Sequence, residues 1–239
     1  MLSKLAALLP DLPRLVETRG MLLSGRSELL EAPGPGPVDF IARGTDFGLI
    51  CVSGNPALPG LEAAARRFGA TAVLCAADAS ESLAAALPGW TRARAVIHSR
   101  RGGGVSAGPS DSSTARVEML SGRDAASLSH VPEPLREEIS TALGFSHVAA
   151  AFVEQRPVSF CYAVYETEGL WDISIDTLEA HRGKGLARAC CEFLIEHMSR
   201  HGKEPVWGAL EENVASRTMA KSLGFAPVDE LAVFRRAEP

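Results

Sequence analysis

The stretch that decides the fold is DISIDTLEAHRGKGLARACCEFLIEHM, residues 172–198. It begins as an alternating apolar run, passes through Gly-Lys-Gly and continues with a helical pattern. A helix N-terminus presents unpaired N–H groups, glycines let an anion approach the backbone, and Arg182 and Lys184 add full positive charges. The pattern predicts a pyrophosphate site at Arg182, Gly183, Lys184, Gly185, Leu186 and Ala187. The alternative is a helix that begins at a tight turn with solvated cations beside it.

Periodic patterns predict the elements around this stretch. A strand at 115–120 and a helix at 133–144, closed by Gly144, come first. Three strands in hairpin connection follow as an antiparallel meander, at 147–155, 157–166 and 170–177. The helix after Gly185 has one apolar face, made by Leu186, Ala187, Cys190, Phe193, Leu194 and Met198, with Gly202 beyond its end. A strand, a helix and a strand complete this half, at 205–210, 213–224 and 227–236.

The first half of the chain also alternates between strand and helix patterns. Strands are expected at 39–44, 47–54, 71–76 and 92–99, with helices at 58–70 and 80–90. Residues 1–20 have the apolar spacing of an amphipathic helix and lack a signal-peptide pattern. The run VSGNPALPG, residues 52–60, could line a ligand loop, although a plain strand-to-helix turn is favoured. We therefore expect two parts: a smaller α/β domain of unknown role, 1–110, and a larger mixed α/β domain, 114–239, joined by a Gly/Ser-rich connector at 101–113.

Composition narrows the classes of function. The chain has 239 residues, 46% of them hydrophobic, and a net charge of −5, which gives no electrostatic basis for binding nucleic acid. It contains no run of eighteen apolar residues, so a membrane partner is not expected. The 5 cysteines are odd in number and none forms a CxxC pair, so neither a metal site nor a disulfide framework is predicted, and a reducing, cytoplasmic location is expected.

Three kinds of phosphate-binding loop contain closely spaced glycines like Gly183 and Gly185. A P-loop requires four residues between its first glycine and a Gly-Lys-Ser/Thr sequence. Here Gly183-Lys184 is followed by Gly185 and Leu186, so the P-loop pattern fails. The dinucleotide fingerprint requires a glycine where Arg188 stands, after a strand that opens a parallel sheet, so an NAD-binding enzyme is a weak alternative. The third pattern, R/Q-x-x-G-x-G/A after a strand, fits RGKGLA. With the downstream block ENVASRTMAKSLGF, residues 212–225, the second half resembles the GNAT superfamily of acyl-CoA-dependent N-acyltransferases. It is similar in particular to the two-domain group that includes zwittermicin-resistance acetyltransferases.

The resemblance implies acetyl-CoA as cofactor, a small-molecule amine as acceptor, and a set of site residues. The strand before the turn would pair with the pantetheine arm through Ile175, Asp176 and Thr177, and Asn213 and Ser216 would contact the cofactor. For Asn213 the alternative is an N-cap, and both roles can hold together. Asp172 is the first candidate for the general base, and Glu211 is the second; for each, a surface carboxylate or a substrate anchor is the favoured alternative.

One departure from the superfamily pattern leaves the function open. Many members carry a Tyr seven residues after the Asn, as proton donor to the leaving thiolate, and this chain has Ala220 there. Another group or water could protonate the thiolate, whose free pKa is about 8.5. The alternative function is a non-catalytic acyl-CoA-binding sensor or scaffold. The role of the first half, including a homodimer surface, is not decided by these patterns.

Overall fold

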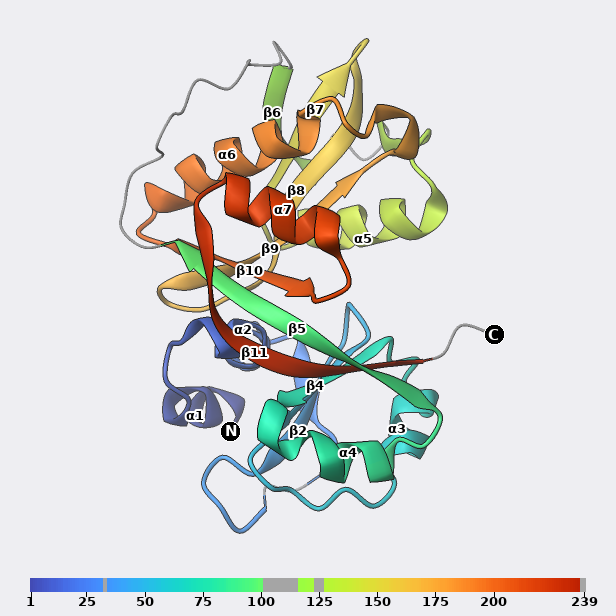
Figure 1. Ribbon diagram of the computed structural model, residues 1–239, viewed down its shortest axis with the longest axis vertical. Coiled ribbons are helices and arrows are strands. Elements are labelled where there is room, and N and C mark those ends of the chain that lie inside the picture. Colours follow the sequence, from blue (N-terminus) through green and yellow to red (C-terminus); the bar gives the residue numbers. More distant parts are fainter. Residues whose placement is uncertain (32–33, 101–115, 123–126, 237–239) are drawn as a thin grey trace.

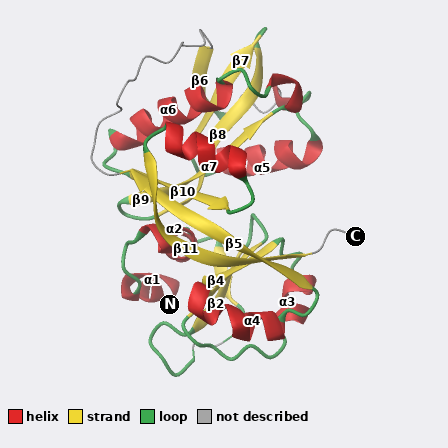
Figure 2. Ribbon diagram, viewed as in Figure 1, coloured by secondary structure: helices red, strands yellow, loops and turns green. Residues whose placement is uncertain are grey.

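All strands of the described chain belong to one sheet. The computed structural model describes residues 1–31, 34–100, 116–122 and 127–236. Its 11-stranded sheet has the order β1-β2-β3-β4-β11-β5-β10-β9-β8-β7-β6. In Figures 1 and 2 the long strands β5 and β11 run side by side across the middle of the molecule, with one half of the chain on each side of them. The predicted mixed α/β class is confirmed.

The first half supplies the outer strands on one side of the sheet. Its strands are β1 (Ser27–Leu29), β2 (Phe40–Gly44), β3 (Leu49–Ser53), β4 (Ala72–Ala76) and β5 (Trp90–Arg100). Its helices are α1 (Leu2–Leu8), η1 (Pro13–Leu15), α2 (Val16–Leu23), α3 (Leu61–Arg67), η2 (Ala77–Ala79) and α4 (Ser80–Ala86). Strands β3 and β4 are parallel, because α3 carries the chain back between them.

The second half follows the predicted order of elements. Its strands are β6 (Arg116–Leu120), β7 (Val148–Val153), β8 (Arg156–Glu166), β9 (Leu170–Thr177), β10 (Glu204–Leu210) and β11 (Phe225–Arg236). Its helices are α5 (Glu133–Leu143), η4 (Glu179–His181), α6 (Leu186–Ser199) and α7 (Val214–Ser222). Strands β7, β8 and β9 pair antiparallel, which confirms the meander.

Strands β5 and β11 join the two halves. β5 comes from the first half, yet it pairs with β10 and β11 of the second half. β11 ends the second half and pairs with β4 of the first. The halves therefore share a continuous hydrogen-bonded sheet, and the division at residues 110 and 114 stays a prediction about domains. The predicted connector, 101–113, lies outside the described residues.

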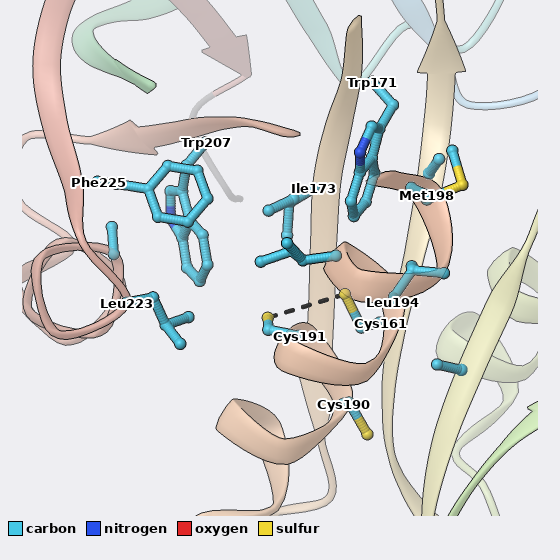
Figure 3. Close-up of a cluster of buried hydrophobic side chains, with 14 of the residues drawn as sticks. Cys161, Trp171, Ile173, Cys190, Cys191, Leu194, Met198, Trp207, Leu223 and Phe225 are labelled. Atoms are coloured by element: carbon cyan, nitrogen blue, oxygen red, sulfur yellow. Dashed lines mark hydrogen bonds between the residues drawn. The ribbon is translucent and has the colours of Figure 1, made fainter. Parts of the chain in front are cut away.

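Helices cover the second half's strands on both faces. Cys161 and Trp171 point to the face covered by α6 and α7, where they join a core with Cys191, Leu194 and Trp207 (Figure 3). Neighbouring residues of β8, Phe160 and Tyr162, point to the opposite face and pack with residues of α5. This alternation is the period of two expected of a strand that is buried on both faces.

One local prediction needs correction. The single amphipathic helix expected in residues 1–20 is wrong: α1 ends at Leu8, and α2 begins at Val16. Pro10 and Pro13 lie between them, and proline cannot donate the backbone hydrogen bond that a continuous helix needs. The predicted C-cap of α5 is confirmed: it is Gly144, with φ of −71°. Among the described helices, none is long and apolar enough to cross a membrane.

Candidate acyl-CoA site

The site begins where two parallel strands separate. The ladder between β9 and β10 runs from Leu170 opposite Glu204 to Asp172 opposite Val206. Beyond this point β9 continues against β8 as far as Thr177, and β10 continues against β5 as far as Leu210. The facing edges of the two strands are then no longer paired with each other, so their N–H and C=O groups can accept another extended chain. We call this feature the β9/β10 opening.

The predicted pyrophosphate turn lies directly after β9. Gly183 has φ of 74° and Gly185, the N-cap of α6, has φ of 77°. These values lie in the left-handed region that side chains disfavour, and a Cβ on Gly183 would meet nothing within 4 Å. Backbone conformation, rather than crowding by the protein, therefore requires glycine at 183. The space beside it is open to a ligand.

Both cations of the turn fold back along it and remain exposed. Arg182 Nε donates to Thr177 O at 3.2 Å, and Lys184 Nζ donates to Ala180 O at 2.9 Å. Leu186 is buried in the core and holds the first turn of α6 in place. The structure thus brings the six predicted residues together as one exposed, cationic helix start. Unpaired N–H groups, left-handed glycines and guanidinium and ammonium groups are the donor set that fits a pyrophosphate.

The side chains of the last residues of β9 hold the sheet and α5 together. The Tyr162 hydroxyl lies 2.8 Å from Glu138 Oε1 and 3.2 Å from Asp176 Oδ2. Burial, and then the charge of Glu138, raises the pKa of Asp176 to about 6. Thr177 Oγ1 lies 2.7 Å from Ser159 Oγ, and Ile175 packs against the α6 core. What these three residues offer a ligand is therefore their backbone edge toward β10.

Asn213 and Ser216 are engaged in structural hydrogen bonds. Asn213 Oδ1 accepts from Ser216 N at 3.0 Å and caps α7, which confirms the N-cap role. Ser216 Oγ accepts from Trp207 Nε1 at 2.9 Å. Asn213 is exposed, so its amide nitrogen is accessible to a ligand. Contact of either residue with a cofactor stays a prediction.

Asp172 occupies the last paired position of the β9/β10 ladder, on the face opposite α6. Its Oδ1 accepts from Tyr165 N at 2.6 Å. Burial raises the pKa of Asp172 to about 7, although hydrogen bonds from backbone N–H groups oppose the shift. Glu17 of α2 interacts with it: burial, and then the charge of Asp172, raises the pKa of Glu17 to about 8. A carboxyl whose pKa is near 7 is suited to general base catalysis.

The second candidate base, Glu211, lies far from Asp172. It follows β10, five residues after Val206, which places it roughly 16 Å along the strand from the position opposite Asp172. Glu211 is exposed, and its Oε1 lies 3.0 Å from Arg94 Nη1. Arg94 is also ion-paired with Glu230. The structure does not bring the two candidate bases together, and it gives Glu211 a partner that compensates its charge.

The position at which many members of the superfamily carry a tyrosine proton donor is buried in this protein. Ala220 is fully buried in the α6/α7 core, beside Leu223 and Phe225. The thiols of that core are equally inaccessible: Cys161 Sγ and Cys191 Sγ lie 3.8 Å apart in Figure 3, and burial raises the pKa of Cys190 to about 12. Buried thiols of high pKa are poor nucleophiles and poor acids.

Two carboxylates near the site gave no sequence signal. Glu17 reaches Asp172 from the other half of the chain, because α2 packs across β8 and β9. Glu138 reaches Tyr162 from α5. Glu17 and Glu138 are far from β8 and β9 in sequence, and only the packing of α2 and α5 on the sheet brings them there.

The sheet with its opening, followed by a glycine turn at the start of a helix, defines the class of protein: a GNAT fold. Residues 140–234 match the family model described as GNAT acetyltransferase. Among curated proteins, none matches the sequence significantly.

Solved structures share the fold along the whole chain. A GCN5-related N-acetyltransferase-like protein from Streptococcus suis is similar with a TM-score of 0.72 and 17% identity, covering 99% of this chain and 98% of that one. A GCN5-related N-acetyltransferase from Kribbella flavida has a TM-score of 0.58 and 12% identity, covering 100% and 96%. A tandem GNAT protein from the clavulanic acid biosynthesis pathway has a TM-score of 0.57 and 15% identity, covering 100% and 93%. At these identities the likeness concerns the fold.

Proposed function

We propose that this protein is an N-acetyltransferase that moves the acetyl group of acetyl-CoA to the amine of a small molecule by direct attack. The observation that carries the proposal is the β9/β10 opening, which leads directly into the cationic glycine turn at the start of α6. An extended arm that ends in a pyrophosphate has the shape and charge that these two features accept. The family match of residues 140–234 supports acyl transfer.

Each part of the site has a role in this proposal. The backbone of Ile175, Asp176 and Thr177 pairs with the pantetheine arm, and the turn at 182–187 holds the pyrophosphate. Acetyl-CoA, if bound by these residues, would supply an activated thioester carbonyl, and Asp172 lies where the opening begins. Asn213 and Ser216 contribute from the start of α7, which follows the opposite strand, β10.

Asp172 acts as the general base. An amine resembling a free lysine has a pKa of about 10.4 and must lose a proton before or during attack. Asp172, with its pKa raised to about 7, accepts that proton more readily than an ordinary carboxylate does. A backbone N–H of β9 stabilises the developing oxyanion, and water or another group protonates the departing thiolate. Glu211 is the second candidate for the base, and its alternative role is a substrate anchor.

The first experiment is a calorimetric titration with acetyl-CoA, CoA, NAD and ATP. Tight acetyl-CoA binding that is lost in Arg182→Glu/Lys184→Glu is the expected result, because the reversal places negative charge beside the pyrophosphate. Arg200→Glu is the matched control for Arg182→Glu, since it reverses one exposed cation at the other end of α6. Absence of CoA binding by well-folded protein would refute the proposal, and NAD competing with CoA would revive the dinucleotide alternative.

A second assay tests turnover. CoA release is measured with a broad panel of small amines, and at least one amine should give release that requires Asp172. Zwittermicin-like polyamines belong in the panel because of the subgroup resemblance. We also expect a cytoplasmic location, since all 5 cysteines are free. Gel filtration would decide whether the protein is a homodimer.

A non-catalytic acyl-CoA-binding module is the alternative function, and one observation favours it. Ala220 is buried and carries no proton donor where many GNAT proteins place a tyrosine. Turnover that Asp172→Asn abolishes without loss of acetyl-CoA affinity would exclude this alternative. Acetyl-CoA binding with no release of CoA across the whole amine panel would support it.

A further inference from the structure

A groove lies beside α7, on the side of β5 and β11. It has a volume of about 490 Å³, and its floor is formed by β5 and the start of β11. The α7 residues that line it recur at the spacing of one helix face: Val214, Arg217, Thr218 and Lys221. We call this feature the α7 groove.

The α7 groove is separate from the candidate acyl-CoA site. In the strand order β11-β5-β10-β9, the groove lies at β11 and β5, whereas the β9/β10 opening lies between the other two strands. Ser216, whose Oγ accepts from Trp207, and Ala220, which is buried in the α6/α7 core, lie on the other face of α7. Among the described residues that line the groove, none belongs to the predicted cofactor set. A ligand in the groove therefore does not use the cofactor residues.

The floor of the groove holds a histidine that is almost completely buried. His98 is 3% exposed and stands opposite Pro227, where a β-bulge interrupts the β5–β11 ladder. Its Nδ1 lies 3.2 Å from Trp207 O, and since a carbonyl oxygen only accepts hydrogen bonds, Nδ1 carries the proton. In the neutral ring Nε2 is then an acceptor, and no described residue donates to it. A ligand with a hydrogen-bond donor would satisfy this nitrogen.

The wall made by α7 carries two cations without carboxylate partners in the described chain. Arg217 Nη1 donates to Glu211 O at 2.9 Å, which orients the guanidinium, while its Nε is buried and lacks a hydrogen-bond partner among the described residues. Lys221 is exposed and forms no ion pair with any residue that the structure describes. The described lining of the groove contains no Asp or Glu. The groove is therefore positively charged and complements a carboxylate.

Apolar side chains complete the groove. Val214 is 66% exposed on α7, and Phe225, Ala226 and Pro227 line the groove from β11. An apolar group that covers Val214 would remove this side chain from water, which is favourable. A concave, mainly apolar surface with a few polar groups that fix orientation is typical of small-molecule sites. The groove therefore favours an anion with an apolar body over a small inorganic anion.

We propose that the α7 groove binds a small hydroxyaryl carboxylate. The carboxylate pairs with Arg217 and Lys221, the hydroxyl donates to His98 Nε2, and the ring covers Val214. The probe is 4-hydroxyphenylacetate, which carries a carboxylate and a phenol on one ring. Phenylacetate is its matched partner, because it differs only in lacking the hydroxyl. Neither compound has an amine, so neither can serve as the acceptor in the proposed acetyl transfer.

The test is calorimetric titration of the full-length protein with each probe, alone and with saturating acetyl-CoA. We expect one equivalent of 4-hydroxyphenylacetate to bind, about five- to tenfold more tightly than phenylacetate, which is the contribution of about one hydrogen bond. Acetyl-CoA should leave both affinities unchanged, because the two sites share no residue. His98→Phe should remove the preference between the probes while phenylacetate still binds.

Variants at exposed positions of α7 test the site without disturbing the core. Lys221→Glu should weaken both probes roughly tenfold or more, because it removes a charged hydrogen bond to the carboxylate, and Lys4→Glu, at an exposed lysine of α1, is its control. Thr218→Trp fills the groove and should abolish binding. Ala215→Trp is the matched control, exposed on the same helix but outside the groove.

Four results would overturn the inference: no binding of either probe at millimolar concentration, equal affinities of the two probes, binding that Lys221→Glu and Thr218→Trp leave intact, or competition by acetyl-CoA. The last result would place the probe in the β9/β10 opening. Probe binding with the expected preference, in a protein that does not bind acetyl-CoA, would support this inference while refuting the proposed acetyl-CoA site.

Discussion

The half-buried carboxyl pair Glu17 and Asp172 should make the protein less stable as the pH rises. Burial raises the pKa of Glu17 from 4.5 to about 8 and that of Asp172 from 3.8 to about 7. Between pH 4 and pH 8 the folded protein therefore holds protons that the unfolded chain has released. The free energy of unfolding then falls with increasing pH through this window and levels off above it.

The size of the effect follows from the shifts. One pKa unit corresponds to about 1.4 kcal/mol, so the shift in the pKa of Glu17 alone represents on the order of 3 to 5 kcal/mol. Part of this free energy comes from the interaction of Glu17 with Asp172. A typical domain is stable by only about 5 to 15 kcal/mol, so the loss should be easy to detect. Glu17→Gln removes the ionisable group and nearly keeps its shape.

The assay is urea unfolding of the wild type and Glu17→Gln at pH 5, 7 and 9. The variant should match the wild type within about 1 kcal/mol at pH 5, where both carboxyls are neutral, and exceed it by a few kcal/mol at pH 9. Glu17→Gln/Asp172→Asn should lose most of this pH dependence, and what remains below about pH 7 comes from Asp176, whose pKa is raised to about 6. Glu137→Gln, which removes an exposed carboxylate of α5, is the control and should change little. Equal pH dependence in wild type and Glu17→Gln would refute the reasoning.

Three further predictions concern the site, the packing of α2 and the joined sheet. If Asp172 is the base, kcat/KM for an active amine should rise with pH through about 7, and Asp172→Asn should lower the rate at least 100-fold and remove that limb; a variant that keeps the limb would exclude the role. Gly20→Ala should destabilise the protein by about 1 to 3 kcal/mol in urea unfolding, because the added Cβ would lie 2.9 Å from Tyr165 Cβ and 3.0 Å from the backbone of Glu166. Helix propensity alone would instead stabilise the variant by about 1 kcal/mol, and that result would contradict this packing. Residues 114–239 produced alone should not fold cooperatively, since β10 and β11 lose β5 from between them; a sharp thermal transition and dispersed amide NMR signals for this fragment would show that β5 is dispensable.

Local patterns determined the elements of this protein and their order. The alternating runs at 147–177 formed the meander, and the apolar face after Gly185 formed α6, because a strand or a helix is set by the period of its own side chains. The turn at 182–187 was predictable for the same reason: positive φ at Gly183 and Gly185 is a property of a few consecutive residues. Asn213 likewise acts as an N-cap through a hydrogen bond only three residues long.

What the tertiary structure decided are the relations between distant segments. The exchange of β5 and β11, the meeting of Glu17 with Asp172 and the separation of Asp172 from Glu211 all depend on which strands become neighbours. The residue patterns of β5 and β11 show that they are strands. They do not show which strands pair, because the backbone groups that form the hydrogen bonds are the same in every strand. The sequence by itself therefore determined the glycine turn and the order of elements, while the joined sheet and the meeting of Glu17 with Asp172 arose only when the sheet was assembled.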